Sequence, residues 1–124
     1  MDLKYFCDEW LNAWTGNKPE HLRSFYSDDA FYRDPVLPKG VSGADLLPYF
    51  KKLLAKNPRW IWTAVELLPT PTGFCLKWKA EIPVGETAIY EIGLDIVDVH
   101  DGKIVRNEVY FNTALLLSAM NKKI

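Results

Sequence analysis

Residues 74–112, FCLKWKAEIPVGETAIYEIGLDIVDVHDGKIVRNEVYFN, decide the fold. Apolar and polar residues alternate through residues 74–82, a period of two that is typical of a strand with one buried face. Residues 87–100 are rich in Ile, Val and Tyr, which favours a second, long strand. Asp101-Gly102 predicts a hairpin because both residues tolerate positive φ, so residues 103–112 are expected to pair back on the long strand.

Three helices are predicted before these strands. Residues 2–14 carry apolar side chains at helical spacing, which gives one broad apolar stripe. A second helix is expected over residues 21–26, with Asn17 and Glu20 as a capping pair at its start. The third helix begins at Asp45 and holds a proline in its first turn, where the missing N–H would have no helical partner.

The segments between these helices and strands are shorter. Asp28-Asp29 marks a turn before a short strand over residues 30–33, and Asp34-Pro35 halts that strand because proline moves its predecessor out of helical geometry. Residues 36–43 are expected to form a loop, and residues 59–68 another strand. Helices followed by a meander of antiparallel strands predict an α+β fold with the helices on one face of the sheet.

Length and charge limit the possible functions. The chain has 124 residues, the size of one domain, so residues 1–124 are predicted to form a single domain. Hydrophobic residues make up 48% of the chain, enough for a packed core. The formal net charge is -1 and no dense stripe of Lys and Arg occurs, so neither nucleic acid nor an anionic membrane is an expected partner. A small neutral molecule is a more suitable partner for a chain with this charge.

Motifs for metals, redox chemistry and nucleotides are missing from the sequence. Cys7 and Cys75 lie far apart without a C-x-x-C pair, and His21 and His100 have no ligand-spaced partners, so no metal site is expected and both histidines are predicted at the surface. Without a G-x-G-x-x-G, P-loop or G-x-S-x-G motif, no cofactor is expected. The charged start of the chain is unlike a signal peptide and no stretch is long enough to span a membrane, so a cytoplasmic location is the expectation.

Two stretches resemble a known superfamily: FYSDDAFYRDPV at residues 25–36 and DGKIV at residues 101–105. In this order, with a helix between them, they are similar to the nuclear transport factor two-like, or SnoaL-like, superfamily, which includes ketosteroid isomerases and polyketide cyclases. The resemblance covers nearly the whole chain. It implies a cone in which a curved antiparallel sheet and N-terminal helices surround a central pocket, commonly in homodimers. Function stays open, since one fold hosts many functions.

Asp34 corresponds to the general base of the ketosteroid isomerases, a carboxylate that moves a proton on a carbon beside a carbonyl. Partial desolvation at the rim of an apolar cavity makes a carboxylate a better base near neutrality. A second interpretation carries equal weight: Asp34 binds backbone N–H groups of the loop that follows it, as aspartates before turns often do.

Asp95 interrupts the apolar run of residues 92–97. In the isomerases an acid near this place donates a hydrogen bond to the developing enolate oxygen. Period-two counting puts Asp95 on the face of Val97 and Val99. Pairing across the hairpin predicts that this face also carries Val105, Asn107, Val109 and Phe111. The alternative is a carboxylate at a bulge or on the outer face.

The resemblance also bears on the ligand contacts. The isomerases have a tyrosine on the first helix that shares the oxyanion, and Trp10 stands in its place; an indole N–H donates one hydrogen bond but does not release a proton as a phenol does. Trp10 and Trp14 are interpreted first as core aromatics that also touch a ligand. Gly93 stands where the family's epoxide hydrolases have an arginine, which disfavours their mechanism. The remaining predicted contacts are Asn107 as a polar anchor and an apolar wall of Phe50, Trp78, Ile82, Val109 and Phe111.

Two hypotheses follow from these residues. As an enzyme, the protein would use Asp34 to abstract a carbon-bound proton from a hydrophobic carbonyl compound, with Asp95 and either Trp10 or Asn107 steadying the enolate oxygen, as in an isomerase, cyclase or lyase. As a binding protein, it would hold a small apolar ligand without turnover, or use its sheet face chiefly for dimerisation.

Overall fold

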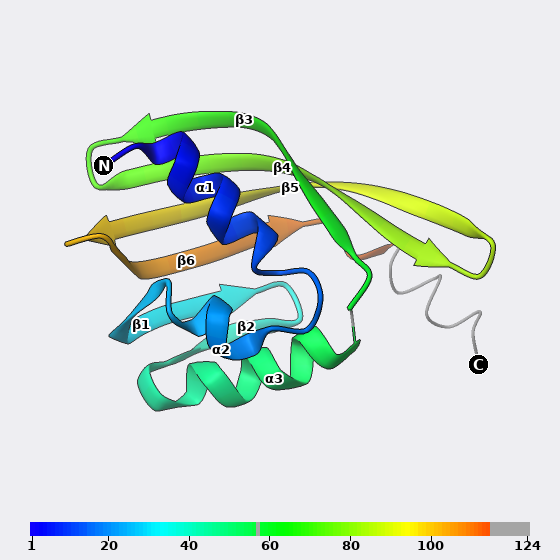
Figure 1. Cartoon of the computed structure of the whole chain (residues 1–124), viewed down its shortest axis with the longest axis horizontal. Helices are drawn as coiled ribbons and strands as arrows, with labels where there is room; N and C mark the ends of the chain where they lie inside the picture. The colour runs from blue at the N-terminus through cyan, green and yellow to red at the C-terminus, as the bar shows by residue number, and fades with distance from the viewer. Residues whose placement is uncertain (57, 115–124) are drawn as a thin grey trace.

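The computed structural model describes residues 1–56 and 58–114, and Figure 1 shows their arrangement. The helices are α1 (Leu3–Asn12), α2 (Pro19–Arg23), the short 3-10 helix η1 (Gly43–Asp45) and α3 (Leu46–Lys56). The strands are β1 (Tyr26–Asp34), β2 (Leu37–Ser42), β3 (Ile61–Thr70), β4 (Gly73–Val84), β5 (Thr87–His100) and β6 (Lys103–Phe111).

These strands form one curved sheet in the order β2-β1-β6-β5-β4-β3. The strands from β3 to β6 are an antiparallel meander, and the hairpin between β5 and β6 turns at Asp101 and Gly102, which both have positive φ. The predicted α+β fold, with a curved sheet and N-terminal helices, is confirmed. One pair differs from the antiparallel prediction: β1 runs parallel to β6. A parallel pair needs a long connection, and here β2, α3 and the strands β3, β4 and β5 separate β1 from β6 in the chain.

Helix α1 covers the inner face of the sheet (Figure 1). Asp2 caps it by accepting a hydrogen bond from the backbone N–H of Tyr5, and the helix buries Cys7, Trp10 and Leu11. The alternation predicted for β4 is confirmed, since its inner side chains are all buried while both of its lysines are exposed. These inner side chains are Phe74, Leu76, Trp78, Ala80 and Ile82.

The second helix and the strand after it differ from the prediction. Asn17 does not cap α2: it has a φ of 54°, and the residue at the cap position, Lys18, makes no side-chain cap hydrogen bond. Pro19 opens the helix instead, because its fixed φ suits the first turn. The helix ends at Arg23, so residues 26–29 lie in β1 rather than in a helix and a turn.

The predicted loop at residues 36–43 is also wrong, because Leu37–Ser42 forms the edge strand β2. This strand contains Pro38 and Gly40, which in sequence indicate a loop. Proline is tolerated there because an edge strand has one side without ladder hydrogen bonds. Gly40 has a φ of 74° and lies under the ring of Phe31, a position that no side chain could share.

A bulge near the hairpin changes which residues of β6 face inward. Asp98 pairs with Arg106 and Val99 pairs with Ile104, so Val105 is an extra residue between two pairs. Ile104 is therefore buried where Val105 was predicted. Beyond the bulge the prediction is confirmed for Asn107, Val109 and Phe111, which pair with the inward-facing residues of β5.

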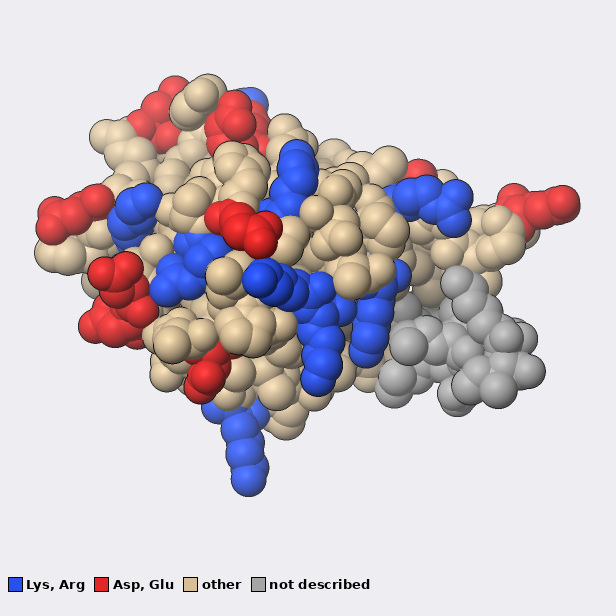
Figure 2. All heavy atoms as spheres, turned by 60° about the horizontal axis from the view of Figure 1, so that its bottom comes forward, with Lys and Arg blue, Asp and Glu red and all other residues tan. Residues whose placement is uncertain are grey.

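Within the described part of the chain, no helix is long and apolar enough to cross a membrane. Figure 2, which brings the bottom of Figure 1 forward, shows acidic and basic side chains interspersed over that face. His21 and His100 are exposed, as predicted.

Candidate functional site

Asp34 is the last residue of β1 and is only 5% exposed. Its Oδ1 accepts hydrogen bonds of 2.9 Å from the backbone N–H groups of Val36 and Leu37, because Pro35 between them and the acid has no N–H to offer. The structure therefore contains the turn contact of the second interpretation. That contact uses one oxygen of the carboxylate and leaves the other for side chains.

Two tyrosines hold that second oxygen. Oδ2 of Asp34 accepts hydrogen bonds from the hydroxyls of Tyr32, at 2.8 Å, and Tyr49, at 2.7 Å. Burial, followed by the nearby carboxylate, raises the pKa of both phenols, so both stay protonated donors. A carboxylate has about four lone-pair positions, and here four donors occupy them. A role as base therefore requires one donor to move away.

Asp95 lies on the inner face of β5, where it pairs with Leu76 of β4 and Val109 of β6. It is 4% exposed, which excludes the predicted alternative of an outer-face carboxylate. Its Oδ1 accepts a 2.7 Å hydrogen bond from Nε1 of Trp78, and its Oδ2 accepts a 3.0 Å bond from Nδ2 of Asn107.

Burial raises the pKa of Asp95 from 3.8 to about 7, although the hydrogen bonds from Asn107 and Trp78 oppose the rise. The charge of Asp34 adds to the increase. The two acids share the inner face of the sheet, on strands β1 and β5, which β6 separates.

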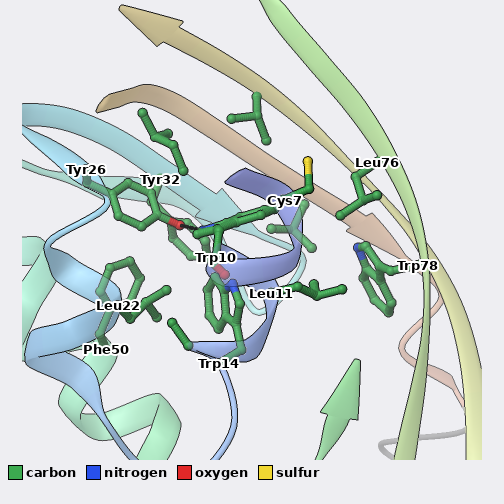
Figure 3. Close-up of a cluster of buried hydrophobic side chains, with 14 of the residues drawn as sticks. Cys7, Trp10, Leu11, Trp14, Leu22, Tyr26, Tyr32, Phe50, Leu76 and Trp78 are labelled. Carbon is green, nitrogen blue, oxygen red and sulfur yellow. Dashed lines mark hydrogen bonds between the residues drawn. The ribbon is translucent and has the colours of Figure 1, made fainter. Parts of the chain in front are cut away.

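A chain of buried polar groups continues from Asn107. Its Oδ1 accepts a 2.8 Å hydrogen bond from the hydroxyl of Tyr26. That hydroxyl accepts a 3.2 Å bond from Nε1 of Trp10, and Figure 3 shows these two side chains together. Asn107 and Trp10 are completely buried. A tyrosine hydroxyl thus lies beside Trp10, and it comes from β1 and not from the first helix.

The other predicted ligand contacts are packed against one another. Trp14 contacts Phe50 at a ring-centroid distance of 5.6 Å and Tyr32 at 6.0 Å, while Trp78 contacts Phe111 at 5.8 Å. Figure 3 shows these tryptophans between α1 and the sheet. Except for the half-buried Phe111, the predicted wall residues are buried: Phe50, Trp78, Ile82 and Val109. All of them belong to or pack against the core.

A surface hollow lies elsewhere, beside α2 and the start of β1. It is lined by Glu20, Arg23, Ser24, Tyr26, Ser27, Asp28 and Lys103, and so contains neither Asp34 nor Asp95. Arg23 and Lys103 already donate hydrogen bonds to backbone carbonyls there, which indicates a structural role for both cations. Residues 1–56 and 58–114 contain no group of three His, Cys, Asp or Glu side chains that could hold a metal ion.

The hydrogen-bonding tyrosines of this site, Tyr26, Tyr32 and Tyr49, were not predicted, and neither was Glu91, which shares the inner face. Tyr32 and Glu91 share the inner face with Asp34 and Asp95 by period-two counting, so a signal for them existed in the sequence. Glu91 pairs with Ala80, and its Oε2 is buried without a hydrogen-bond partner among the described residues. Tyr49 belongs to α3, and no local pattern indicates that this helix brings it to Asp34.

The curved sheet, its covering helices and the two inward-facing acids define the NTF2-like class of fold. A family model described as SnoaL-like domain matches residues 7–107, so the chain belongs to that family. No curated protein sequence matches the chain.

Solved structures agree with this assignment. AclR from Streptomyces galilaeus, named as a candidate hydroxylase, has 18% identity and a TM-score of 0.78 over 98% of this chain and 96% of its own. TerC, crystallised with polyporic acid, has 13% identity and a TM-score of 0.79 over 95% and 97%. A candidate SnoaL-like polyketide cyclase from a Jannaschia species has 10% identity and a TM-score of 0.75 over 94% and 89%. At these identities the similarity shows the fold alone.

Proposed function

We propose that the protein is a cofactor-independent enzyme that moves a proton on a carbon beside the carbonyl of a small hydrophobic compound, as an isomerase, cyclase or lyase would. The observation that carries this proposal is the burial of two acids, Asp34 and Asp95, on the inner face of a SnoaL-like sheet. Buried acids are costly to a fold and, where they persist, cluster at functional sites.

In this proposal Asp34 is the general base. Its carboxylate takes the carbon-bound proton, and the electrons of the broken C–H bond move onto the carbonyl oxygen to give an enolate. Tyr49 is only half-buried, whereas Tyr32 is fully buried, so Tyr49 is the donor that an entering ligand would displace. Its departure would free one lone pair of Asp34 Oδ2.

Asp95 is the second acid of the proposed reaction. With a pKa of about 7 it is present in both protonation states near neutral pH. Its protonated form would donate a hydrogen bond to the enolate oxygen, in a setting where water is largely excluded and the interaction is strong. The proton would return from Asp34 to carbon, so no cofactor is consumed.

The ligand needs room that the packed rings of Trp14, Tyr32 and Phe50 now occupy. Half-buried aromatic side chains at the edge of the core are the ones that would move to admit it: Tyr49, Trp60, Trp62 and Phe111. A hydrophobic ligand fits, because apart from the two acids and Asn107 the buried side chains of this region are apolar or aromatic.

The test is a screen of enolisable carbonyl compounds, with tryptophan fluorescence to report binding and solvent deuterium uptake to report proton abstraction. Asp34→Asn should lower turnover by about 100-fold or more, the usual scale of a lost general base, while binding persists. Asp29→Asn is the matched control, because Asp29 lies on the same strand but is exposed. Equal deuterium uptake in Asp34→Asn and the unchanged protein would exclude Asp34 as the base.

A second candidate function is ligand binding without turnover. It is favoured by one observation, the four donors that already occupy the Asp34 carboxylate. In the same screen, compounds that bind but exchange no deuterium in any variant would support this function and contradict the first.

We further propose that the protein is a homodimer. The outer face of the sheet carries exposed apolar side chains, interspersed with Lys77 and Lys79 of β4 and defined here as the outer patch: Ile61, Leu68, Ile92, Leu94 and Tyr110. Exposed apolar side chains gathered on one face mark interaction surfaces, and a twofold dimer would bury the same face of both copies.

A further inference from the structure

The buried polar chain from Trp10 to Asp95 has a fixed direction. The indole N–H of Trp10 is a donor only, so the hydroxyl oxygen of Tyr26, 3.2 Å away, must accept from it. The Tyr26 hydroxyl keeps one proton to donate, and the acceptor at 2.8 Å is Oδ1 of Asn107. The amide of Asn107 therefore turns its Nδ2 toward Asp95 Oδ2, at 3.0 Å.

The second donor to Asp95 is equally one-directional. Nε1 of Trp78 also has only a proton to give, and it lies 2.7 Å from Oδ1. Asp95 is thus enclosed by two donors, and neither Trp78 nor the locked Asn107 offers an acceptor for a proton on the carboxyl group. Asn107 alone could become an acceptor, by turning its amide through half a rotation.

We infer that Trp10 and Tyr26 are positioning residues that lock the amide of Asn107 with its N–H toward Asp95 and so hold Asp95 as a hydrogen-bond acceptor. The catalytic meaning of this lock rests on the proposed function: when Asp95 is protonated, neither Trp78 nor Asn107 accepts its proton, which is then left for the enolate oxygen of a ligand. The lock itself rests on three hydrogen bonds between buried groups and on the chemistry of the indole N–H.

No other described titratable group that acts on Asp95 replaces these donors. Asp34 on β1 raises the pKa of Asp95 further, as burial does. Cys7 on α1 and Tyr26 and Tyr32 on β1 also interact with Asp95, and burial raises the pKa of all three, so they are neutral near pH 7. The hydrogen bonds from Asn107 and Trp78 are therefore what opposes the cost of ionising Asp95.

The lock predicts what happens when Trp10 loses its N–H. In Trp10→Phe the Tyr26 hydroxyl is free to accept from Nδ2 of Asn107, so Asn107 can present Oδ1 to a protonated Asp95. The protonated form gains an acceptor that it lacks in the unchanged protein. The pKa of Asp95 should rise by about one unit, the scale of one hydrogen bond to a carboxyl group.

The experiment is a pH titration of the carboxyl carbons by nuclear magnetic resonance of protein labelled with ¹³C in aspartate, with Asp95→Asn to assign the signal. Trp14→Phe is the matched control, because Trp14 is on the same apolar stripe but makes no hydrogen bond to Asp95, Asn107 or Tyr26. A midpoint raised in Trp10→Phe but unchanged in Trp14→Phe supports the lock. Equal midpoints in all three proteins, or a lower one in Trp10→Phe, would overturn it.

Tyr26→Phe gives an independent reading if Trp10→Phe does not fold. Without the Tyr26 hydroxyl nothing holds Oδ1 of Asn107, so the midpoint of Asp95 should again rise, and an unchanged midpoint would overturn the lock. Because the titration needs no substrate, its result stands even if the screen finds no turnover. A protein with the predicted shift and no activity would separate failure of the proposed function from failure of the lock.

Discussion

The indole of Trp78 lies across the backbone of Gly93, its partner in the ladder between β4 and β5. A methyl group at position 93 would fall 2.7 Å from Cε2 of Trp78 and still closer to two further carbons of the same ring. Because Gly93 has no side chain, the indole of Trp78 can pack directly against the backbone of β5, and in this position its Nε1 lies 2.7 Å from Oδ1 of Asp95. Gly93 thus makes room for a hydrogen-bond donor to Asp95.

Gly93→Ala should therefore destabilise the protein by about 1–3 kcal/mol, the usual cost of overpacking a core. The added methyl group pushes the indole away and weakens its hydrogen bond to Asp95. Urea unfolding followed by circular dichroism measures the loss, and the same substitution in a Trp78→Phe background is the control, because phenylalanine lacks the second ring. An equal loss in both backgrounds would contradict the contact.

The strands and turns that carry strong local signals could be predicted from the sequence. The alternation in β4 and the Asp101-Gly102 turn are set by residues that are neighbours in the sequence. Contacts with other parts of the chain did not change either of them. The bulge at Val105 could not be predicted, since one extra residue shifts the face of a strand without altering its composition. Strand β2 was missed because its proline and glycine, typical of loops, are tolerated at a sheet edge.

The polar residues at the centre of the site could be predicted from the sequence, but the residues that bind them could not. Asp34 was identified because its neighbours resemble a family motif. Asp95 and Asn107 were identified because each is a polar residue within an apolar strand. Their hydrogen-bond donors were not, because the contact between Tyr49 of α3 and Asp34 of β1 depends on how a helix docks against a sheet. Likewise, the pairing of Trp10 with Tyr26 joins residues from α1 and β1. Contacts between residues of different helices and strands leave no pattern in the local sequence.

The contribution of Asp95 to the stability of the protein should fall as pH rises from about 4 to about 7. The pKa of Asp95 is about 7 in the folded protein against 3.8 for a free side chain, so across this window the folded state binds more protons than the unfolded state. The free energy of unfolding then decreases with pH. The loss from this group approaches about 4 kcal/mol, at about 1.36 kcal/mol for each of roughly three pKa units.

Urea unfolding at a series of pH values measures this slope. Asp95→Asn should flatten it, whatever its effect on stability at any single pH. Asp101→Asn serves as the comparison, because Asp101 is exposed in the hairpin turn and should leave the slope unchanged. A slope that persists in Asp95→Asn would assign the titration to another group.

The two tyrosines that bind Asp34 should differ in their contribution to stability. Tyr32→Phe removes a hydrogen bond to a charged acceptor from a fully buried position and should cost about 1.5–3 kcal/mol. Tyr49→Phe should cost less, about 1 kcal/mol, because Tyr49 is half-buried and water can take its place. Tyr5→Phe on the exposed surface of α1 is the control and should be neutral. Equal costs for Tyr32→Phe and Tyr49→Phe would mean that Tyr49 is no more replaceable than Tyr32, which would argue against it as the donor that a ligand displaces.

The outer patch gives the test of the proposed homodimer. Ile92 is 49% exposed near the middle of this face, with Leu94 beside it on the same strand, so a lysine at position 92 would place a charge inside the contact between two copies. Ile92→Lys should shift the protein from dimer to monomer in sedimentation velocity runs over a range of concentrations, because an unpaired buried charge is costly. Tyr5→Lys introduces the same charge at an exposed aromatic residue of α1 and should leave the dimer intact. If the unchanged protein sediments as a monomer at every concentration, or Tyr5→Lys dissociates it as readily as Ile92→Lys, the outer patch is not the dimer interface.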